Sequence, residues 1–103
     1  MARKAFVILT LAFHREGKNW IGTCVELSTS TYGRGLDRVH QELLELIQLH
    51  LDTLEDIGER ERFFQEHGIT IYTDHVPDTV RSDVHVDSDQ FIEARSVEVP
   101  VGA

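Results

Sequence analysis

The sequence predicts one α+β domain over residues 1–103, in which a small, mostly antiparallel sheet of three or four strands carries one long helix. Three observations point to this class. Residues 5–13 form an almost wholly apolar run, which is typical of a buried strand. From residue 36 the apolar residues recur with the period of a helix. A chain of 103 residues that is 41% hydrophobic is long enough for one packed core and too short for two.

The first part of the chain predicts the sheet. The run Ala5–Phe13 is rich in Val, Ile, Leu and Phe, which suits a central strand covered on both faces. Gly17 lies in a short polar turn before a second strand that begins at Trp20, so these two strands should pair as an antiparallel hairpin. The Ser- and Thr-rich stretch Ser28–Tyr32 predicts a short third strand at the edge of the sheet.

The next segment predicts a long helix. At about 100° per residue, one broad face collects the apolar side chains, and Gly58 follows where a helix commonly ends. The opposite face is acidic, and Leu49 projects from it between Glu45 and Asp52. This leucine is either a singly exposed apolar residue or a contact for a partner. The apolar face comprises Leu36, Val39, Leu43, Leu44, Leu46, Ile47, Leu51, Leu54 and Ile57.

The rest of the chain predicts a short second helix over Glu59–His67 and a late strand over Phe91–Val101 that returns to the sheet. Ile69–Tyr72 is a strand or an extended connection. The residues between Tyr72 and Phe91 are expected to be loosely structured. The predicted order is therefore strand, strand, strand, helix, helix, strand.

Charge and cysteine content exclude several classes of function. The net charge of −8 opposes binding to the phosphates of nucleic acid, so we expect no autonomous nucleic-acid binding. Residues 36–67 carry three basic and nine acidic side chains, which favours a basic protein partner. The apolar run near the N-terminus is too short to cross a bilayer, so no membrane association is expected. A single cysteine, Cys24, cannot form an internal disulfide, and the expected location is cytoplasmic.

No motif for catalysis or cofactor binding is recognisable. The sequence has neither a G-x-S-x-G motif nor a phosphate-binding glycine loop, and Cys24 lies in a predicted strand as a small buried hydrophobe, so we expect no enzyme and no cofactor. The best metal candidate is the alternation of Asp83, His85, Asp87 and Asp89, which in an extended chain would project to one side. This pattern lacks the glycine and the distal glutamate of a calcium loop and matches a solvated strand face, so no metal site is assigned.

Several short segments carry a family resemblance. They are the opening strand Phe6–Leu11, the Gly17–Trp20 turn into Ile21–Leu27, Gly33 ahead of the long helix, and the late stretch Asp89–Glu93. Together with the order of elements, they resemble the HicB-like antitoxin family over nearly the whole chain. The resemblance implies a reduced ribonuclease-H-like fold without catalytic carboxylates. Members that repress their own operon carry a DNA-binding module after the late strand, so this chain is expected to be a stand-alone HicB-like domain.

The resemblance also implies a non-catalytic module that neutralises a small basic toxin by direct binding. The candidate contact surface is the acidic side of the long helix, with Glu42, Glu45, Leu49, Asp52 and Asp56. Self-association is expected as well, because one long helix on a four-stranded sheet leaves a sheet face or an edge strand uncovered. Two other functions stay open, namely an orphan homo-oligomeric module and a metal-dependent hydrolase that uses residues 83–89.

Overall fold

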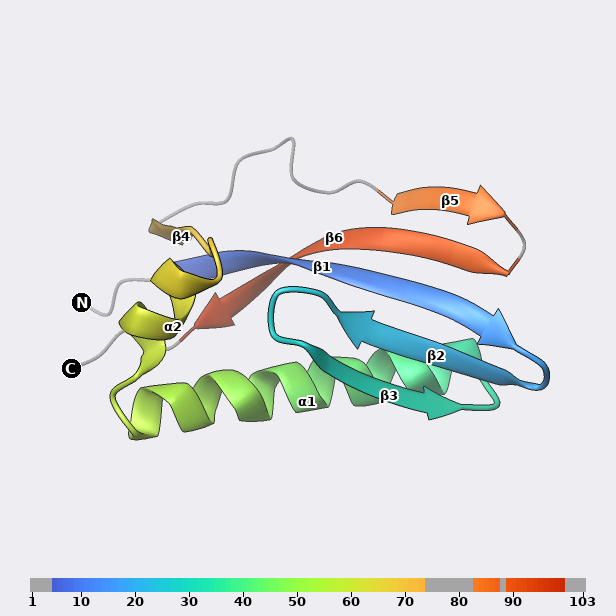
Figure 1. The fold of residues 1–103 in the computed structure, drawn as a ribbon, viewed down its shortest axis with the longest axis horizontal. Coiled ribbons are helices and arrows are strands. Elements are labelled where there is room, and N and C mark those ends of the chain that lie inside the picture. Colours follow the sequence, from blue (N-terminus) through green and yellow to red (C-terminus); the bar gives the residue numbers. More distant parts are fainter. Residues whose placement is uncertain (1–4, 74–82, 88, 100–103) are drawn as a thin grey trace.

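A six-stranded antiparallel sheet with two helices forms the part of the chain that the computed structural model describes, residues 5–73, 83–87 and 89–99 (Figure 1). For residues 83–87 this description covers the backbone. The α+β class predicted from the sequence is confirmed. The elements are β1 (Ala5–Glu16), β2 (Asn19–Cys24), β3 (Thr29–Gly33), α1 (Leu36–Asp56), α2 (Arg60–Glu66), β4 (Ile71–Thr73), β5 (Asp83–Asp87) and β6 (Gln90–Val99).

The central strand of the sheet is β1. The strand order is β3-β2-β1-β6-β5, and β4 pairs with the beginning of β1 beyond the end of β2. Strands β1 and β6 are in register over ten residue pairs, from Ala5–Val99 to His14–Gln90. The sheet has six strands where three or four were expected. The additional strands are β4, which is only three residues long, and β5, which alternates polar and apolar residues.

A glutamate fills the gap between β2 and β4 along the edge of β1. The carboxylate of Glu26 accepts hydrogen bonds from the backbone N–H of Thr10 at 2.7 Å and from its hydroxyl at 2.8 Å. The N–H of Val25 donates to the carbonyl oxygen of Thr10 at 3.0 Å. Buried backbone groups need hydrogen-bond partners. At Thr10 the loop after β2 supplies the donor and the acceptor that a neighbouring strand would otherwise provide.

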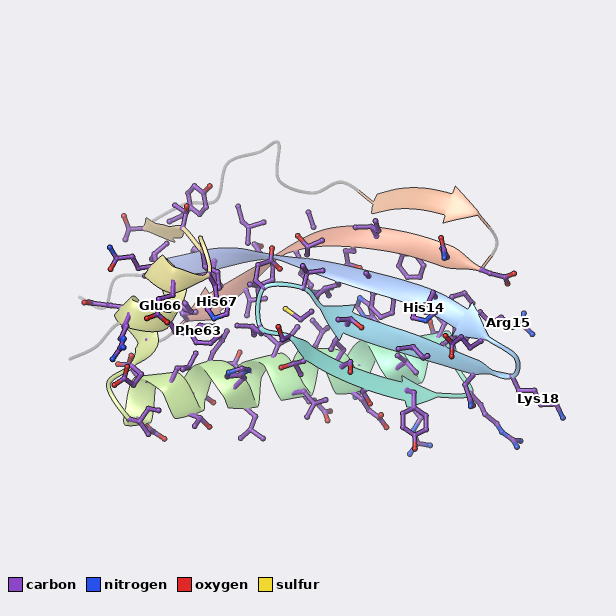
Figure 2. The ribbon with its side chains drawn as sticks, in the orientation of Figure 1. His14, Arg15, Lys18, Phe63, Glu66 and His67 are labelled. Atoms are coloured by element: carbon purple, nitrogen blue, oxygen red, sulfur yellow. The ribbon has the colours of Figure 1, made fainter. Side chains whose placement is uncertain are left out.

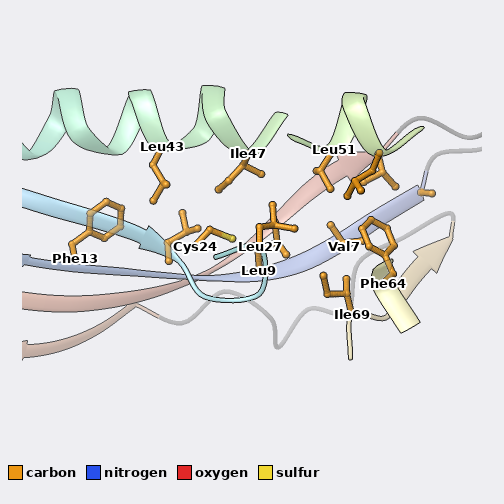
Figure 3. Packing of buried hydrophobic residues seen from close by; sticks show 14 of the residues in the cluster. Val7, Leu9, Phe13, Cys24, Leu27, Leu43, Ile47, Leu51, Phe64 and Ile69 are labelled. Atoms are coloured by element: carbon orange, nitrogen blue, oxygen red, sulfur yellow. The ribbon is translucent and has the colours of Figure 1, made fainter. Parts of the chain in front are cut away.

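The core lies between the sheet and α1 (Figure 3). Alternate side chains of β1, including Val7, Leu9 and Leu11, face the helix and are fully buried. The second helix closes the same core with Phe64. From α1, the residues Val39, Leu43, Ile47, Leu51 and Leu54 are buried, at the three- and four-residue spacing predicted for its apolar face.

Two members of the expected apolar face lie outside the core. Leu46 is half-buried but does not pack against the buried cluster. Ile57 is 63% exposed, because α1 ends at Asp56 and the chain turns there toward α2. Gly58 follows with a φ of 73°, a left-handed conformation that suits glycine at the end of a helix.

The helix packs closely on the sheet at Gly22 in β2. A Cβ atom added there would lie 2.8 Å from Cε1 of Phe13 and 3.0 Å from Cγ1 of Val39. The ring of Phe13 is stacked on Phe91 at 4.7 Å and on His40 at 5.4 Å between ring centroids. Only glycine fits between these side chains without displacing one of them.

Candidate protein-binding face

Four of the five predicted contact residues form one exposed stripe along α1. Glu45, Asp52 and Asp56 are exposed, and Leu49 in their midst is 63% exposed. Their spacing of four, three and four residues places them above one another on the same helix face. We call these four residues the acidic ridge.

The fifth predicted residue, Glu42, lies at the margin of this stripe. It is half-buried and accepts hydrogen bonds from Nε of Arg38 at 3.1 Å and from the hydroxyl of Thr31 at 3.2 Å. Because Thr31 belongs to β3, Glu42 helps to join α1 to the edge of the sheet. Its carboxylate is therefore already engaged within the chain.

No described basic side chain forms an ion pair with the acidic ridge. In the described part of the chain, the ion pairs of α1 carboxylates are those of Glu42 with Arg38 and of Glu55 with Arg60, and neither includes a ridge residue. The basic side chains Arg15 and Lys18 lie at the tip of the β1–β2 hairpin, at the opposite end of the molecule from α2 (Figure 2).

A second polar cluster, which the sequence did not predict, joins α1 to β6. Nε2 of His40 lies 3.0 Å from one carboxylate oxygen of Glu93, and Arg95 donates to the other at 3.2 Å. The side chain of Glu93 is only 14% exposed. A carboxylate held on both oxygens stabilises the contact between helix and sheet and is poorly placed to accept a proton from a substrate. His40 and Glu93 are 53 positions apart in the sequence, so no local pattern could have revealed the pair.

Three residues of the predicted metal candidate lie in β5. Asp83 pairs with Glu93, His85 with Phe91 and Asp87 with Gln90, with a register shift between His85 and Asp87. The side chains of residues 83–87 lie outside the described part of the structure.

Asp89 lies in the turn before β6, where its carbonyl oxygen accepts from the N–H of Arg15 at 2.8 Å. Among the side chains that are described, no three His, Cys, Asp or Glu residues are grouped as metal ligands.

The single thiol, that of Cys24, is unreactive at neutral pH. Cys24 is fully buried, and burial raises the pKa of its thiol from 9.0 to about 11. It is therefore protonated at neutral pH and is no nucleophile, in agreement with its prediction as a small buried hydrophobe.

Neither helix is long and apolar enough to cross a membrane.

Comparison of the chain with protein-family models, with curated proteins and with solved structures finds no match.

Proposed function

We propose that this chain is a non-catalytic, cytoplasmic protein-binding module whose acidic ridge docks a small basic protein. The observation that carries the proposal is the 63% exposure of Leu49 within a row of exposed carboxylates. Carboxylates speed the approach of a basic partner, whereas an apolar side chain among them holds a partner that offers a pocket.

The chemistry of the buried polar groups supports a binding role. The thiol of Cys24 keeps its proton, and both oxygens of Glu93 are engaged. Neither group has the exposure that a nucleophile or a general base needs to reach a substrate.

The resemblance to HicB-like antitoxins extends the proposal to the kind of partner. Three antiparallel strands, a long helix and a late strand beside the first occur here in the order that suggested the family. A small basic toxin, neutralised by direct binding, is the partner that this resemblance and the charge of α1 jointly favour.

The experiment is capture of partners from cell lysate, followed by a kinetic titration of the isolated partner with ridge variants. Glu45→Lys and Asp52→Lys together reverse two ridge charges, and the control combines Glu16→Lys with Glu61→Lys, which changes the net charge equally at other exposed positions. We expect the ridge pair to slow association about tenfold or more at low salt, and the control to have a much smaller effect.

Leu49→Ala should act on dissociation instead, accelerating it about fivefold or more if the side chain fills a pocket. Recovery of DNA or RNA as the main ligand would refute the partner class. An association rate that responds equally to the ridge pair and to its control would refute the ridge as the binding surface.

A further inference from the structure

A free strand edge runs along β3. Strand β3 is the last strand in the order β3-β2-β1-β6-β5, and all five of its residues pair regularly with β2, from Trp20–Gly33 to Cys24–Thr29. In the part of the chain that the structure describes, no strand pairs with the other edge of β3 (Figure 1). Backbone N–H and C=O groups along such an edge are available to a further strand.

The two outermost strands of the sheet differ in how they resist such pairing. Proteins protect edge strands with charged side chains and with bulges. Strand β5, at the opposite end of the strand order, contains Asp83, His85 and Asp87, and its pairing with β6 has a register shift. The residues of β3 include no charged side chain, and its pairing with β2 has no register shift. The edge of β3 therefore lacks the features that would keep another strand away.

Apolar side chains flank this edge on both faces of the sheet. The hydroxyl of Thr31 donates to Glu42 of α1, so the next residue, Tyr32, points to the other face, where it is 72% exposed. On the helix side, Leu46 is half-buried. It lies one turn from Glu42 and one turn from His50, whose side chains both contact threonines of β3, so Leu46 is on the side of α1 that faces β3. A strand added to the edge would pack against Tyr32 and Leu46.

The surroundings of the edge are close to electrically neutral. Residues 27–36 hold a single charged side chain, that of Arg34. On the β3 side of α1, Arg38 and Glu42 form an ion pair at 3.1 Å. The carboxylate of Glu26, in the loop before β3, is hydrogen-bonded to β1 and is therefore turned away from the free edge. A chain with a net charge of −8 can approach another acidic chain here with little local repulsion.

We propose that β3 pairs with β3 of a second copy, antiparallel about a two-fold axis at Thr31, so that the two sheets join into one. In this register all five residues of β3 are paired, and the two Thr31 residues lie opposite each other. Ser30 of each copy lies beside Tyr32 of the other. The axis is perpendicular to the joined sheet, so both α1 helices lie on the same face, antiparallel, one on each side of the axis.

A second copy suits this edge because the edge is complementary to itself. An uncharged strand meets an uncharged strand. The antiparallel helices bring the two Arg38–Glu42 pairs together in opposite directions, so that each arginine points toward the other copy's glutamate. A basic partner would find Glu42 already paired and is attracted to the acidic ridge instead. The ridge lies on the solvent side of α1, so the dimer leaves both ridges exposed and forms whether or not the ridge binds a partner.

The test is sedimentation equilibrium of the full chain at micromolar concentration, combined with amide hydrogen exchange. We expect a dimer, and we expect alternate amides of β3 to exchange more slowly as the protein concentration rises, since their N–H groups point to the free edge. Ser30→Glu should weaken the dimer about tenfold or more, because the symmetric interface contains each added carboxylate twice. Tyr32→Ser removes an exposed ring from the same contact and should weaken the dimer about threefold or more.

Thr23→Glu is the matched control, because Thr23 pairs with Ser30 but lies one strand inward, in β2. It adds the same charge to the same sheet face and should weaken the dimer much less. Circular dichroism shows whether each variant is folded. A chain that stays monomeric, or a dimer that persists unchanged in folded Ser30→Glu and Tyr32→Ser, overturns the proposal. Equal effects of Ser30→Glu and Thr23→Glu, or β3 amides whose exchange does not depend on concentration, overturn it too, because association would then use another surface such as the sheet face.

Discussion

Replacing Gly22 by alanine tests how closely α1 is packed on the sheet. The added methyl group would lie 2.8 Å from the ring of Phe13 and 3.0 Å from a methyl group of Val39. Neither neighbour can move freely, because the ring of Phe13 is stacked between Phe91 and His40 and Val39 is fully buried in α1. The strain must therefore be absorbed by shifting the helix or by moving an aromatic ring out of its stack.

Overpacking of this kind costs about 1–3 kcal/mol of the free energy of unfolding. The entropy of unfolding is about 2.1 cal/mol/K per residue, or about 0.2 kcal/mol/K for a chain of this length. The expected fall in Tm is therefore about 5–14 °C. Gly35→Ala is the control, because no atom lies within 4 Å of a Cβ at that position and its φ is −106°. Because Gly35 is the N-cap of α1, where glycine is favoured over alanine, its cost should be about 1 kcal/mol or less, the lower end of the range for Gly22→Ala.

The assay is thermal unfolding followed by circular dichroism, supported by urea titration. Phe13→Leu supplies a double-mutant cycle, since a smaller side chain at residue 13 should relieve part of the strain and make the two substitutions non-additive. A Tm for Gly22→Ala that matches that of Gly35→Ala would show that the helix adjusts without cost, and would refute the close packing inferred at Gly22.

Three further predictions concern Glu26 and Cys24. Glu26→Ala should lower the free energy of unfolding, measured by urea titration, by about 1–3 kcal/mol, because both hydrogen-bond donors of Thr10 lose their acceptor. Thr10→Ser keeps both donors and should cost less. Equal losses for the two variants would contradict the role of Glu26 as the acceptor for Thr10. Cys24 should resist a thiol-specific disulfide reagent at pH 8 until denaturant is added, and prompt native labelling would show that it is not buried. The pKa of the Cys24 thiol is about 11 in the folded chain and 9.0 ordinarily, so the protonated thiol contributes its full stability below pH 9. This contribution is lost as the pH rises toward 11. Cys24→Ala should reduce the fall in stability over this pH range.

The elements with a strong period were predictable from the sequence. The long helix was expected to begin at Leu36 and does so, and the apolar run at Ala5 does begin the first strand. Asp83–Asp87 was not counted among the strands of the sheet, although its alternation was matched to a solvated strand face, because its partner β6 is identified only by tertiary structure. The number of strands was underestimated for this reason.

The acidic ridge was predictable for a related reason, because the period of a helix tells which side chains share a face. Exposure of Glu45, Leu49, Asp52 and Asp56 follows directly from that period. The contact between the side chains of His40 and Glu93 was not predictable, since it depends on where α1 crosses the sheet. The engagement of Glu42 by Thr31 depends on the same crossing.

The pairing of β1 with β6 has a consequence for how the chain reaches its fold. The central strand is made first, yet the strand that covers one of its edges over ten residue pairs comes from the other end of the chain. Contacts of such long sequence separation form slowly. During synthesis at about 5–20 residues per second, residues 90–99 follow β1 by about 4–17 s. Throughout that interval an apolar strand with an unpaired edge is open to other chains.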